Sequence, residues 1–247
     1  MVKGSIYNKY VKRAFDIVFA VIAFIIVLPV FLVCVIAIKL EDPKGSVFFS
    51  QKRNGKNGAV FTIYKLRTMK SEMCGKQIHP APDMLTRTGK IIRKLSLDEI
   101  PQFYNILRGE MSLIGPRPLL LSYYEWYNET ERRRFNVRPG ITGLSQINGR
   151  ANLNWDERFA LDVRYADNVS FTLDLKIFLK SFFVVFSHKD VIPDDDKAIE
   201  RFDIYRRAQL QKSVPVSRET AVRACGGSGV KSAVVCDLKT GRRSRML

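Results

Sequence analysis

The sequence predicts an α+β protein that is held at a membrane by its N-terminal segment. Three observations support this fold class. A long apolar run, from Ile17 to Ile38, begins soon after the N-terminus. Strand-like alternation on both sides of two Asn-Gly pairs indicates a small β-hairpin at residues 47–69. Helix-like patterns dominate the rest of the chain up to about residue 190 and predict a mainly helical domain.

The composition limits the class of partner. The 247 residues, 46% of them hydrophobic, are enough for a buried core. A formal net charge of +17 favours an anionic partner: nucleic acid, a phosphorylated small molecule or an acidic membrane surface. The four cysteines form no C-x-x-C pair, and the two histidines, His79 and His188, lie far from each other, which argues against a zinc site and a disulfide framework.

The first predicted element is the membrane segment. Its uncharged run of about 22 residues would extend roughly 33 Å as a helix, enough to cross a bilayer core. No small-residue cleavage site follows, so we expect the segment to be retained. Pro29 favours a break in the middle, and the basic flanks favour a re-entrant helix hairpin with both ends on one side. A kinked spanning helix is the alternative, and Asp16 is expected at the interface rather than buried.

The second element is the β-hairpin. Asn54-Gly55 and Asn57-Gly58 are strong turn signals between the two alternating runs. Each basic residue of the hairpin, taken singly, fits a solvated face, but beside a membrane segment the set indicates contact with lipid headgroups or phosphates. The set comprises Lys52, Arg53, Lys56, Lys65 and Arg67. Residues 71–90 are then expected to form a loop.

The stretch LSLDEIPQF, residues 95–103, places two carboxylates side by side at Asp98 and Glu99. A structural interpretation explains both acids. Ser96 and Glu99 match a capping box, Asp98 would lie favourably at the positive end of a helix dipole, and Pro101 requires the helix to begin close by. On this interpretation the helix starts near Ser96 and the acids have no chemical role.

Nearby arginines favour a reactive centre instead. Arg93 precedes the acids, and Arg117 lies between two prolines that restrict its backbone. Carboxylates beside guanidinium groups suit a phosphate site with a divalent cation, because Mg²⁺ takes one or two carboxylates plus phosphate oxygens. One acid could also be a nucleophile that forms an acyl phosphate. From these residues alone, both interpretations of the acidic pair stay open.

The remaining patterns are weaker. RPGITGLSQINGR holds Arg138, Arg150 and three glycines whose N–H groups could approach an anion, although a plain turn is commoner. Residues 155–187 fit a helix, a loop and a second helix. The second helix, from Leu173 to Phe186, fits either the core or a membrane interface, since it is rich in Phe and carries two lysines.

In this order, the stretches resemble the bacterial sugar transferases that act as small monotopic phosphoglycosyl transferases. The resemblance rests on KRAFDIVFA, the proline-broken apolar segment, FTIYKLRTM, RKLSLDEIPQFYNILRGEMSLIGPRP, RPGITGLSQINGR and LDLKIF. It extends from residue 12 to about residue 190, and the DE…GPRP…RPGITG series is highly specific. It implies the small form, without a separate upstream membrane domain: a re-entrant membrane helix (1–40), a cytoplasmic catalytic domain (41–190) and a tail (191–247).

The resemblance also implies a reaction. Such enzymes transfer a sugar 1-phosphate from a UDP-sugar to a polyprenol phosphate, undecaprenyl phosphate, and release UMP at the cytoplasmic face of the bacterial inner membrane. The product would begin assembly of a capsule, exopolysaccharide, O-antigen or glycoprotein glycan. Membrane lipids and pathway glycosyltransferases are then further expected partners. The sugar and the oligomeric state stay open.

Residue roles follow from the same resemblance. Asp98 would attack the β-phosphate of the UDP-sugar to give a covalent phosphosugar intermediate. Glu99 would help to hold Mg²⁺, with Asp98 as a second ligand. The implied substrate-binding residues are Arg93 for the acceptor phosphate, Arg117 and Arg150 for the nucleotide end, and Lys65 and Arg67 for substrate phosphate, with Arg138 added to the set.

The tail departs from the family pattern, because it is polar and basic toward its end, a composition typical of disorder. Two alternative functions compete with transfer. A membrane-tethered nucleic-acid binder would share the basic charge, but no aromatic and basic stripe supports it, so no nucleic-acid partner is expected. A non-catalytic membrane-tethered scaffold of a polysaccharide assembly complex is the stronger alternative. The presence of Asp98, Glu99, Arg93 and Arg117 together argues against it.

Overall fold

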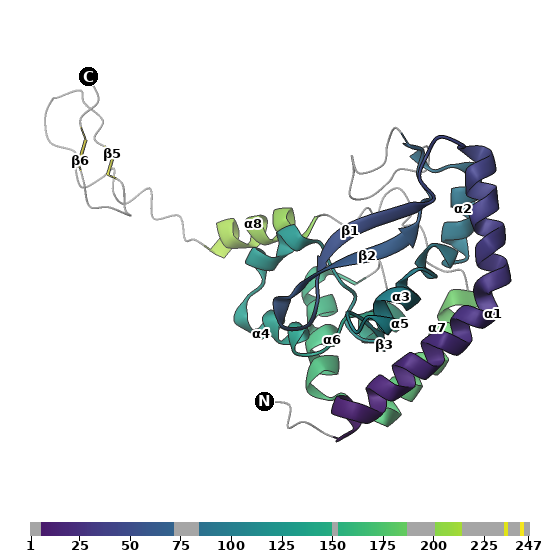
Figure 1. Cartoon of the computed structure of the whole chain (residues 1–247). Helices are drawn as coiled ribbons and strands as arrows, with labels where there is room; N and C mark the ends of the chain where they lie inside the picture. Colours follow the sequence, from purple (N-terminus) through teal and green to yellow (C-terminus); the bar gives the residue numbers. More distant parts are fainter. Residues whose placement is uncertain are drawn as a thin grey trace, which may run out of the picture. The chain divides into compact units, whose positions relative to one another are not determined.

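The structure is a computed structural model that describes residues 6–71, 84–149, 153–186, 201–213, 235–236 and 243–244. Within these residues the chain is mostly helical and carries three small sheets of two strands each (Figure 1). The chain divides into two units, Met1–Arg206 and Arg207–Leu247. All of the predicted site residues that the structure describes belong to the first unit.

The membrane segment is one continuous helix. A π-helical turn, η1 (Tyr7–Val11), leads into α1 (Lys12–Glu41), which is long and apolar enough to cross a membrane. Pro29 lies inside α1, so the break expected at this proline is not seen. Figure 1 shows instead that α1 bends part-way along its length. A bend agrees with a proline in the helix interior, which lacks an N–H donor and clashes with the preceding turn.

Both ends of α1 pack against the first unit. Near its start Ala20 is fully buried in the main core, and near its end Cys34 and Ile38 are buried with Leu66 and Ile92. Between these contacts many large apolar side chains are exposed. They include Val21, Ile22, Ile25, Ile26, Val30, Leu32 and Val33. So large an apolar surface requires a nonaqueous environment, and α1 is therefore a membrane-associated helix.

Buried polar contacts anchor the start of α1. The Lys12 ammonium forms an ion pair of 2.8 Å with Asp174, which also accepts a hydrogen bond of 2.7 Å from the Tyr7 hydroxyl. Asp16 accepts a hydrogen bond of 3.0 Å from the backbone N–H of Leu113. The expectation that Asp16 is not buried is wrong, because only 2% of it is exposed. The Leu113 N–H inside the protein supplies the hydrogen bond that permits this burial.

The predicted hairpin is confirmed. Strands β1 (Phe48–Asn54) and β2 (Val60–Leu66) pair antiparallel in a continuous register, and the 3₁₀ turn η2 (Lys56–Gly58) lies in the connection. Asn57 and Gly58 have positive φ angles of 56° and 76°. Asn and Gly adopt this left-handed conformation more readily than other residues, which explains why this sequence turns here.

The loop predicted for residues 71–90 is partly wrong, because α2 (Arg87–Lys94) begins within it. The Thr86 hydroxyl accepts a hydrogen bond of 2.9 Å from the N–H of Gly89 and caps the helix. Glu41, at the end of α1, accepts hydrogen bonds from two further N–H groups of the first turn. The rest of the predicted loop, residues 72–83, lies outside the described residues.

The described residues between 97 and 213 form short elements and three longer helices. Strands β3 (Ser112–Ile114) and β4 (Gly140–Thr142) pair in parallel. The predicted helix, loop and helix at 155–187 are confirmed as α6 and α7. The elements are η5 (Leu97–Glu99), α3 (Gln102–Leu107), η6 (Leu121–Trp126), α4 (Glu129–Arg132), η7 (Arg133–Asn136), α5 (Leu144–Ile147), α6 (Trp155–Asp167), α7 (Phe171–Phe186) and α8 (Phe202–Ser213).

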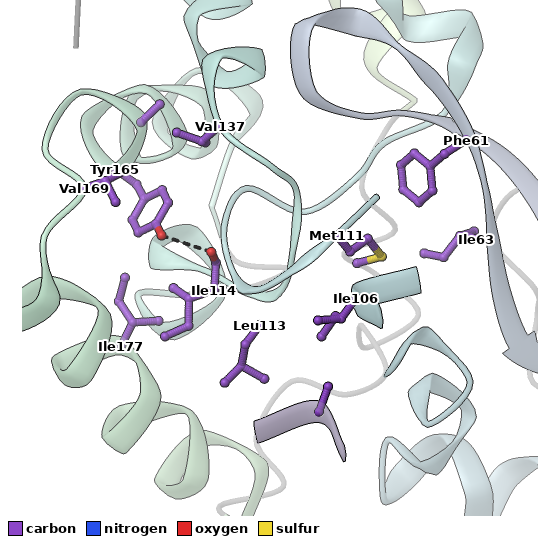
Figure 2. Packing of buried hydrophobic residues seen from close by; sticks show 12 residues of the cluster. Phe61, Ile63, Ile106, Met111, Leu113, Ile114, Val137, Tyr165, Val169 and Ile177 are labelled. Atoms are coloured by element: carbon purple, nitrogen blue, oxygen red, sulfur yellow. Dashed lines mark hydrogen bonds between the residues drawn. The ribbon is translucent and has the colours of Figure 1, made fainter. Parts of the chain in front are cut away.

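The main hydrophobic core joins the hairpin, α3, β3, α6 and α7 (Figure 2). Within it the buried Tyr165 hydroxyl donates a hydrogen bond of 3.0 Å to the carbonyl of Ile114 (Figure 2). A second cluster is aromatic and includes Tyr123, Trp155 and the fully buried Phe202 of α8. Phe202 falls within the range predicted as the tail, so α8 adds an ordered element there.

Helix α7 packs in the core, as one of its predicted alternatives requires, while contact with a membrane interface stays a prediction. Ile177 and Asp174 are buried on one face, whereas 52% of Leu179 and 76% of Phe183 are exposed on another. In the second unit, strands β5 (Val235–Cys236) and β6 (Arg243–Ser244) pair antiparallel. Most of the remaining tail lies outside the described residues, and its predicted disorder stays a prediction.

Candidate functional site

The two adjacent acids lie on a short 3₁₀ turn, η5, and not in the first turn of an α-helix. Ser96 has a left-handed conformation with φ of 56° and makes no capping hydrogen bond through its side chain. The capping-box interpretation of Ser96 and Glu99 is therefore wrong. Helix α3 begins only after Pro101, since a proline in the second helical turn would lack the N–H that bonds to Leu97. The carboxylate of Asp98 therefore does not belong to the first turn of an α-helix and can bind a partner from another element.

Lys65 joins the two acids. Its ammonium lies 3.1 Å from Asp98 Oδ2 and 2.8 Å from Glu99 Oε1. Pairing with Phe49 across the hairpin gives Lys65 the same side of the sheet as the buried residues Phe61 and Ile63. The strand thus directs one lysine inward, where its charge compensates two carboxylates.

Arg117 provides the second cation. Its Nη2 lies 2.8 Å from Glu99 Oε1, and burial lowers the pKa of Arg117 less than the Glu99 charge raises it, so its pKa is raised. Arg134 fixes the position of the loop that carries Arg117. Arg134 donates a hydrogen bond of 2.7 Å to the Arg117 carbonyl and forms a buried ion pair of 2.8 Å with Asp162.

Glu99 is ionised under all ordinary conditions. Burial by itself raises the pKa of Glu99, but the charges of Arg117 and Lys65 outweigh burial and hold the pKa well below its usual range. Both cations also donate hydrogen bonds to the charged form. Glu99 is therefore a fixed negative charge and is unsuited to the role of a general acid.

Arg93, on α2, completes the cluster without a direct ion pair. Burial lowers its pKa, and the positive charge of Arg117 lowers it further, whereas the charges of Asp98 and Glu99 oppose this shift. In the part of the chain that the structure describes, Arg93 forms no ion pair with either acid. Three cations therefore surround two carboxylates, and Arg93 has donors left for an anionic ligand.

The other predicted site residues do not join this cluster. Arg67 is buried and forms an ion pair of 2.9 Å with Asp42 near the end of α1. Arg138 donates a hydrogen bond of 2.9 Å to the carbonyl of Gly109, after α3. Arg150 lies outside the described residues. The structure thus brings Asp98, Glu99, Lys65, Arg117 and Arg93 together, and all of the assigned roles stay predictions.

Arg53 was expected only as one of the basic hairpin residues that contact phosphates, and it was not among the predicted site residues, although its charge interacts with that of Arg117. It lies on the same side of the hairpin as Lys65, because its partner in the register is Phe61. Burial, together with the charge of Arg117, lowers the pKa of Arg53 to about 10. The alternation of side chains along β1 and β2 could have indicated this position from the sequence, because it predicts that Arg53 and Lys65 share a face of the hairpin.

The acids fit one divalent cation. No group of three or more metal-ligating side chains exists among the described residues, so a metal cage made by the protein alone is excluded there. Lys65 donates to Asp98 Oδ2 and to Glu99 Oε1, and Arg117 donates to the same Glu99 Oε1. In the described structure the other two carboxylate oxygens have no hydrogen bond. Mg²⁺ typically takes one or two carboxylates and completes its shell with phosphate and water, which matches this donor set.

Chemically, the cluster suits phosphoryl transfer. One buried carboxylate with an uncommitted oxygen lies among cations that would stabilise the charge of a diphosphate. Among the described residues no imidazole belongs to the cluster. A carboxylate is already ionised at neutral pH, so its attack on a phosphate needs no general base.

Comparison with known proteins identifies the family. The model of the family described as Bacterial sugar transferase matches residues 7–188. An uncharacterized sugar transferase, EpsL of Bacillus subtilis (strain 168), is 48% identical over 169 residues, which cover 67% of this chain and 82% of EpsL.

Two relatives have named activities or processes. The exopolysaccharide production protein ExoY of Sinorhizobium fredii is 38% identical over 189 residues, covering 69% of this chain and 83% of ExoY. The UDP-glucose:undecaprenyl-phosphate glucose-1-phosphate transferase of Caulobacter vibrioides is 40% identical over 181 residues, covering 69% of this chain and 67% of that protein.

Proposed function

This chain belongs to the bacterial sugar transferase family, and we propose that it transfers a sugar 1-phosphate from a UDP-sugar to undecaprenyl phosphate. UMP is the second product. The observation that carries this proposal is the buried Asp98 carboxylate, held beside Glu99 by Lys65 and Arg117. Its relatives include an exopolysaccharide production protein, so the reaction begins the membrane-bound assembly of an exopolysaccharide or capsule.

The first step forms a covalent intermediate. An oxygen of Asp98 forms a bond to the β-phosphorus of the UDP-sugar. The bond from this phosphorus to the oxygen bridging the two phosphates breaks, and its electron pair leaves with UMP. The sugar phosphate is then held on Asp98 as an acyl phosphate.

The second step regenerates the enzyme. A phosphate oxygen of undecaprenyl phosphate attacks the same phosphorus, and the bond to Asp98 breaks. The products are the free carboxylate and undecaprenyl diphosphate sugar. No proton is gained or lost by Asp98 in either step, so the reaction does not require a histidine. Two steps also allow the water-soluble donor and the lipid acceptor to use the site in turn.

The cations hold the phosphates. Arg117, which contacts Glu99, and Arg93, which has uncommitted donors, are positioned to bind the donor and acceptor phosphates. Lys65 keeps Asp98 and Glu99 close despite their like charges. Glu99 and Asp98 would hold Mg²⁺ through their uncommitted oxygens. When bound, this ion neutralises charge on the diphosphate.

The membrane helix is arranged for a lipid acceptor. Both ends of α1 pack against the unit that carries Asp98, which supports a re-entrant segment that enters and leaves the membrane on one face. We assign that face to the cytoplasmic side of the bacterial inner membrane, where a UDP-sugar is available. The exposed middle of α1 would then lie in the lipid, and the phosphate of undecaprenyl phosphate would lie close to Asp98.

The test is UMP release by purified protein with Mg²⁺, undecaprenyl phosphate and a panel of UDP-sugars. The wild-type protein should release UMP with at least one sugar. Asp98→Asn should lower the rate at least about 10³-fold, because it removes the nucleophile. The surface variant Glu125→Gln, which also removes one carboxylate, serves as the matched control. Folded, membrane-bound protein that releases no UMP would contradict the proposal and favour the scaffold.

A further inference from the structure

Helix α8 lies beyond residue 188, where the match to the family model ends. Its first residue, Phe202, is nevertheless fully buried in the first unit. Four aromatic rings surround it, with centroids between 4.8 and 5.5 Å from its own: Tyr123, Tyr127, Trp155 and Phe159. The start of α8 is therefore part of the packed interior.

Two polar contacts hold the same segment. The Tyr205 hydroxyl donates a hydrogen bond of 2.6 Å to Asp156 on α6, and Arg206 forms an ion pair with Glu131 on α4. Side chains three and four residues apart lie on one face of a helix, so Phe202, Tyr205 and Arg206 present a single face to the first unit. The start of α8 is therefore held by polar groups as well as by its buried ring.

The rings that surround Phe202 also contact Arg134. The Arg134 guanidinium lies 5.5 Å from the centroid of the Tyr127 ring and 5.6 Å from that of the Phe159 ring. Its Nη1 donates a hydrogen bond of 3.1 Å to the Tyr127 hydroxyl. Phe202 and Arg134 thus share two rings. Because close-packed interiors transmit displacements, Phe202 limits the movement of Arg134.

Arg134 in turn reaches the acids. Its Nη2 donates a hydrogen bond of 2.7 Å to the carbonyl of Arg117, and Arg117 Nη2 lies 2.8 Å from Glu99 Oε1. Contacts therefore run continuously from Phe202 through Tyr127 and Arg134 to Arg117. A small displacement of a group that binds substrate can cost much of its effect, even when its cause lies far from the reacting atoms.

We propose that Phe202 is a positioning residue: by fixing Tyr127 and Arg134, it sets the position of Arg117 for the donor diphosphate. The proposal rests on the function proposed above, in which Arg117 binds phosphate. It gives a helix outside the family match a role in donor binding. The alternative is that Phe202 only stabilises the aromatic cluster, while the buried ion pair of 2.8 Å with Asp162 is enough to hold Arg134.

A double-mutant cycle separates the two. The affinity for UDP, which carries the donor diphosphate, is measured by calorimetry with Mg²⁺ present, at a temperature at which each variant is folded. Phe202→Ala should weaken UDP binding about tenfold in the wild-type background and less than about twofold in an Arg117→Ala background, because its effect passes through Arg117. Equal weakening in both backgrounds, or none in either, would overturn the proposal. Ile204→Ala, which truncates an exposed side chain of the same helix, is the matched control and should bind UDP as the wild type does.

A second variant tests the same contacts if Phe202→Ala does not fold. Tyr127→Phe keeps the ring and removes only the hydroxyl that accepts a hydrogen bond from Arg134. It should weaken UDP binding about threefold, again only when Arg117 is present. A wild-type affinity in Tyr127→Phe would remove the connection between the ring and Arg134 and would overturn the proposal.

Failure here is distinct from failure of the proposed function. If Asp98→Asn abolishes UMP release while Phe202→Ala binds UDP as the wild type does, the transferase proposal stands and the positioning proposal falls. A wild-type protein that neither binds UDP nor releases UMP would overturn both. A loss of UDP affinity confined to chains that carry Arg117, with a raised KM for the UDP-sugar in UMP release by Phe202→Ala, would support both.

Discussion

Lys65 is the residue on which the acidic pair depends. Two adjacent carboxylates repel each other, and the ammonium of Lys65 contacts both of them, at 3.1 Å and 2.8 Å. Arg117 contacts only Glu99 in the described structure. Asp98 therefore has a single direct cation, and that cation comes from a strand far away in the sequence.

Replacement of Lys65 by Met should lower the rate of UMP release about 10²-fold, because a preorganised charge near the reacting phosphate is lost. The measurement is steady-state UMP release at saturating UDP-sugar. Lys70→Met, which removes an exposed ammonium shortly after β2, should keep the wild-type rate. A wild-type rate in Lys65→Met would show that Asp98 does not need this contact.

Glu99 makes stability depend on pH in a defined direction. Its pKa is lower in the folded than in the unfolded protein, so its contribution to the free energy of unfolding is complete above the unfolded value of about 4.3. The contribution is lost as the pH falls through the lower, folded value. The difference in melting temperature between wild-type protein and Glu99→Gln should therefore be larger at pH 7 than at pH 3. A difference that does not change with pH would disprove the ionic role of Glu99.

Sequence reasoning found the acids but not their local structure. The pattern of Ser96 and Glu99 resembles that of Asn128 and Glu131, yet only the second pair forms a capping box. The two pairs differ because Pro101 follows the first pair and because cations from other elements contact Glu99. A local pattern cannot include partners that are brought together only by the fold.

Among the elements, α1 and α7 are joined by a buried ion pair. Asp174 of α7 accepts hydrogen bonds from Lys12, Tyr7 and Tyr165, each between 2.7 and 2.8 Å. The Phe19 ring of α1 and the Phe178 ring of α7 also make an edge-to-face contact, with centroids 5.1 Å apart. The start of the membrane helix is therefore fixed to the first unit by both polar and apolar contacts.

Lys12→Met should lower the free energy of unfolding by about 3 kcal/mol, because it leaves a buried carboxylate without its cation. Thermal unfolding in detergent measures the loss. Lys90→Met, which removes an exposed lysine from α2, is the matched control. The double variant Lys12→Met, Asp174→Asn should regain much of the stability, since the amide keeps an acceptor without the charge. An unstable double variant would assign the loss to packing instead.

The elements themselves were predicted to different extents. The hairpin and the pair α6 and α7 were evident, because alternation, turn residues and helical periodicity are local properties. Helix α2 was missed because its sequence, RTGKIIRK, contains a glycine and few apolar residues. Its first N–H groups are bonded by Thr86 and by Glu41 of α1, and the second of these partners is distant in sequence.

For the whole molecule, the main result is the placement of α1. Its two ends pack in separate clusters of the same unit, and its exposed middle is apolar. The sequence predicted a membrane segment and favoured a re-entrant one, but it gave no means to locate the two ends. Their contacts with Asp174, Leu113 and Ile92 come from the fold.

A re-entrant α1 predicts that both of its ends are reached from the same side of the membrane. Asn8→Cys and Lys44→Cys, made separately in a chain whose four cysteines are replaced by serine, should both react with a membrane-impermeant maleimide in inverted vesicles. Neither should react in intact spheroplasts. Labelling of one position in vesicles and of the other in spheroplasts would mean that α1 spans the bilayer.

The most direct test of the central claim is the covalent intermediate on Asp98. Purified protein is incubated with Mg²⁺ and the active UDP-sugar, without undecaprenyl phosphate, and its intact mass is measured. We predict an increase equal to one sugar phosphate, mapped to the peptide that contains Asp98, absent from Asp98→Asn and lost when undecaprenyl phosphate is added. UMP release that occurs only when both substrates are present, with no mass increase, would contradict the account and indicate direct transfer between them.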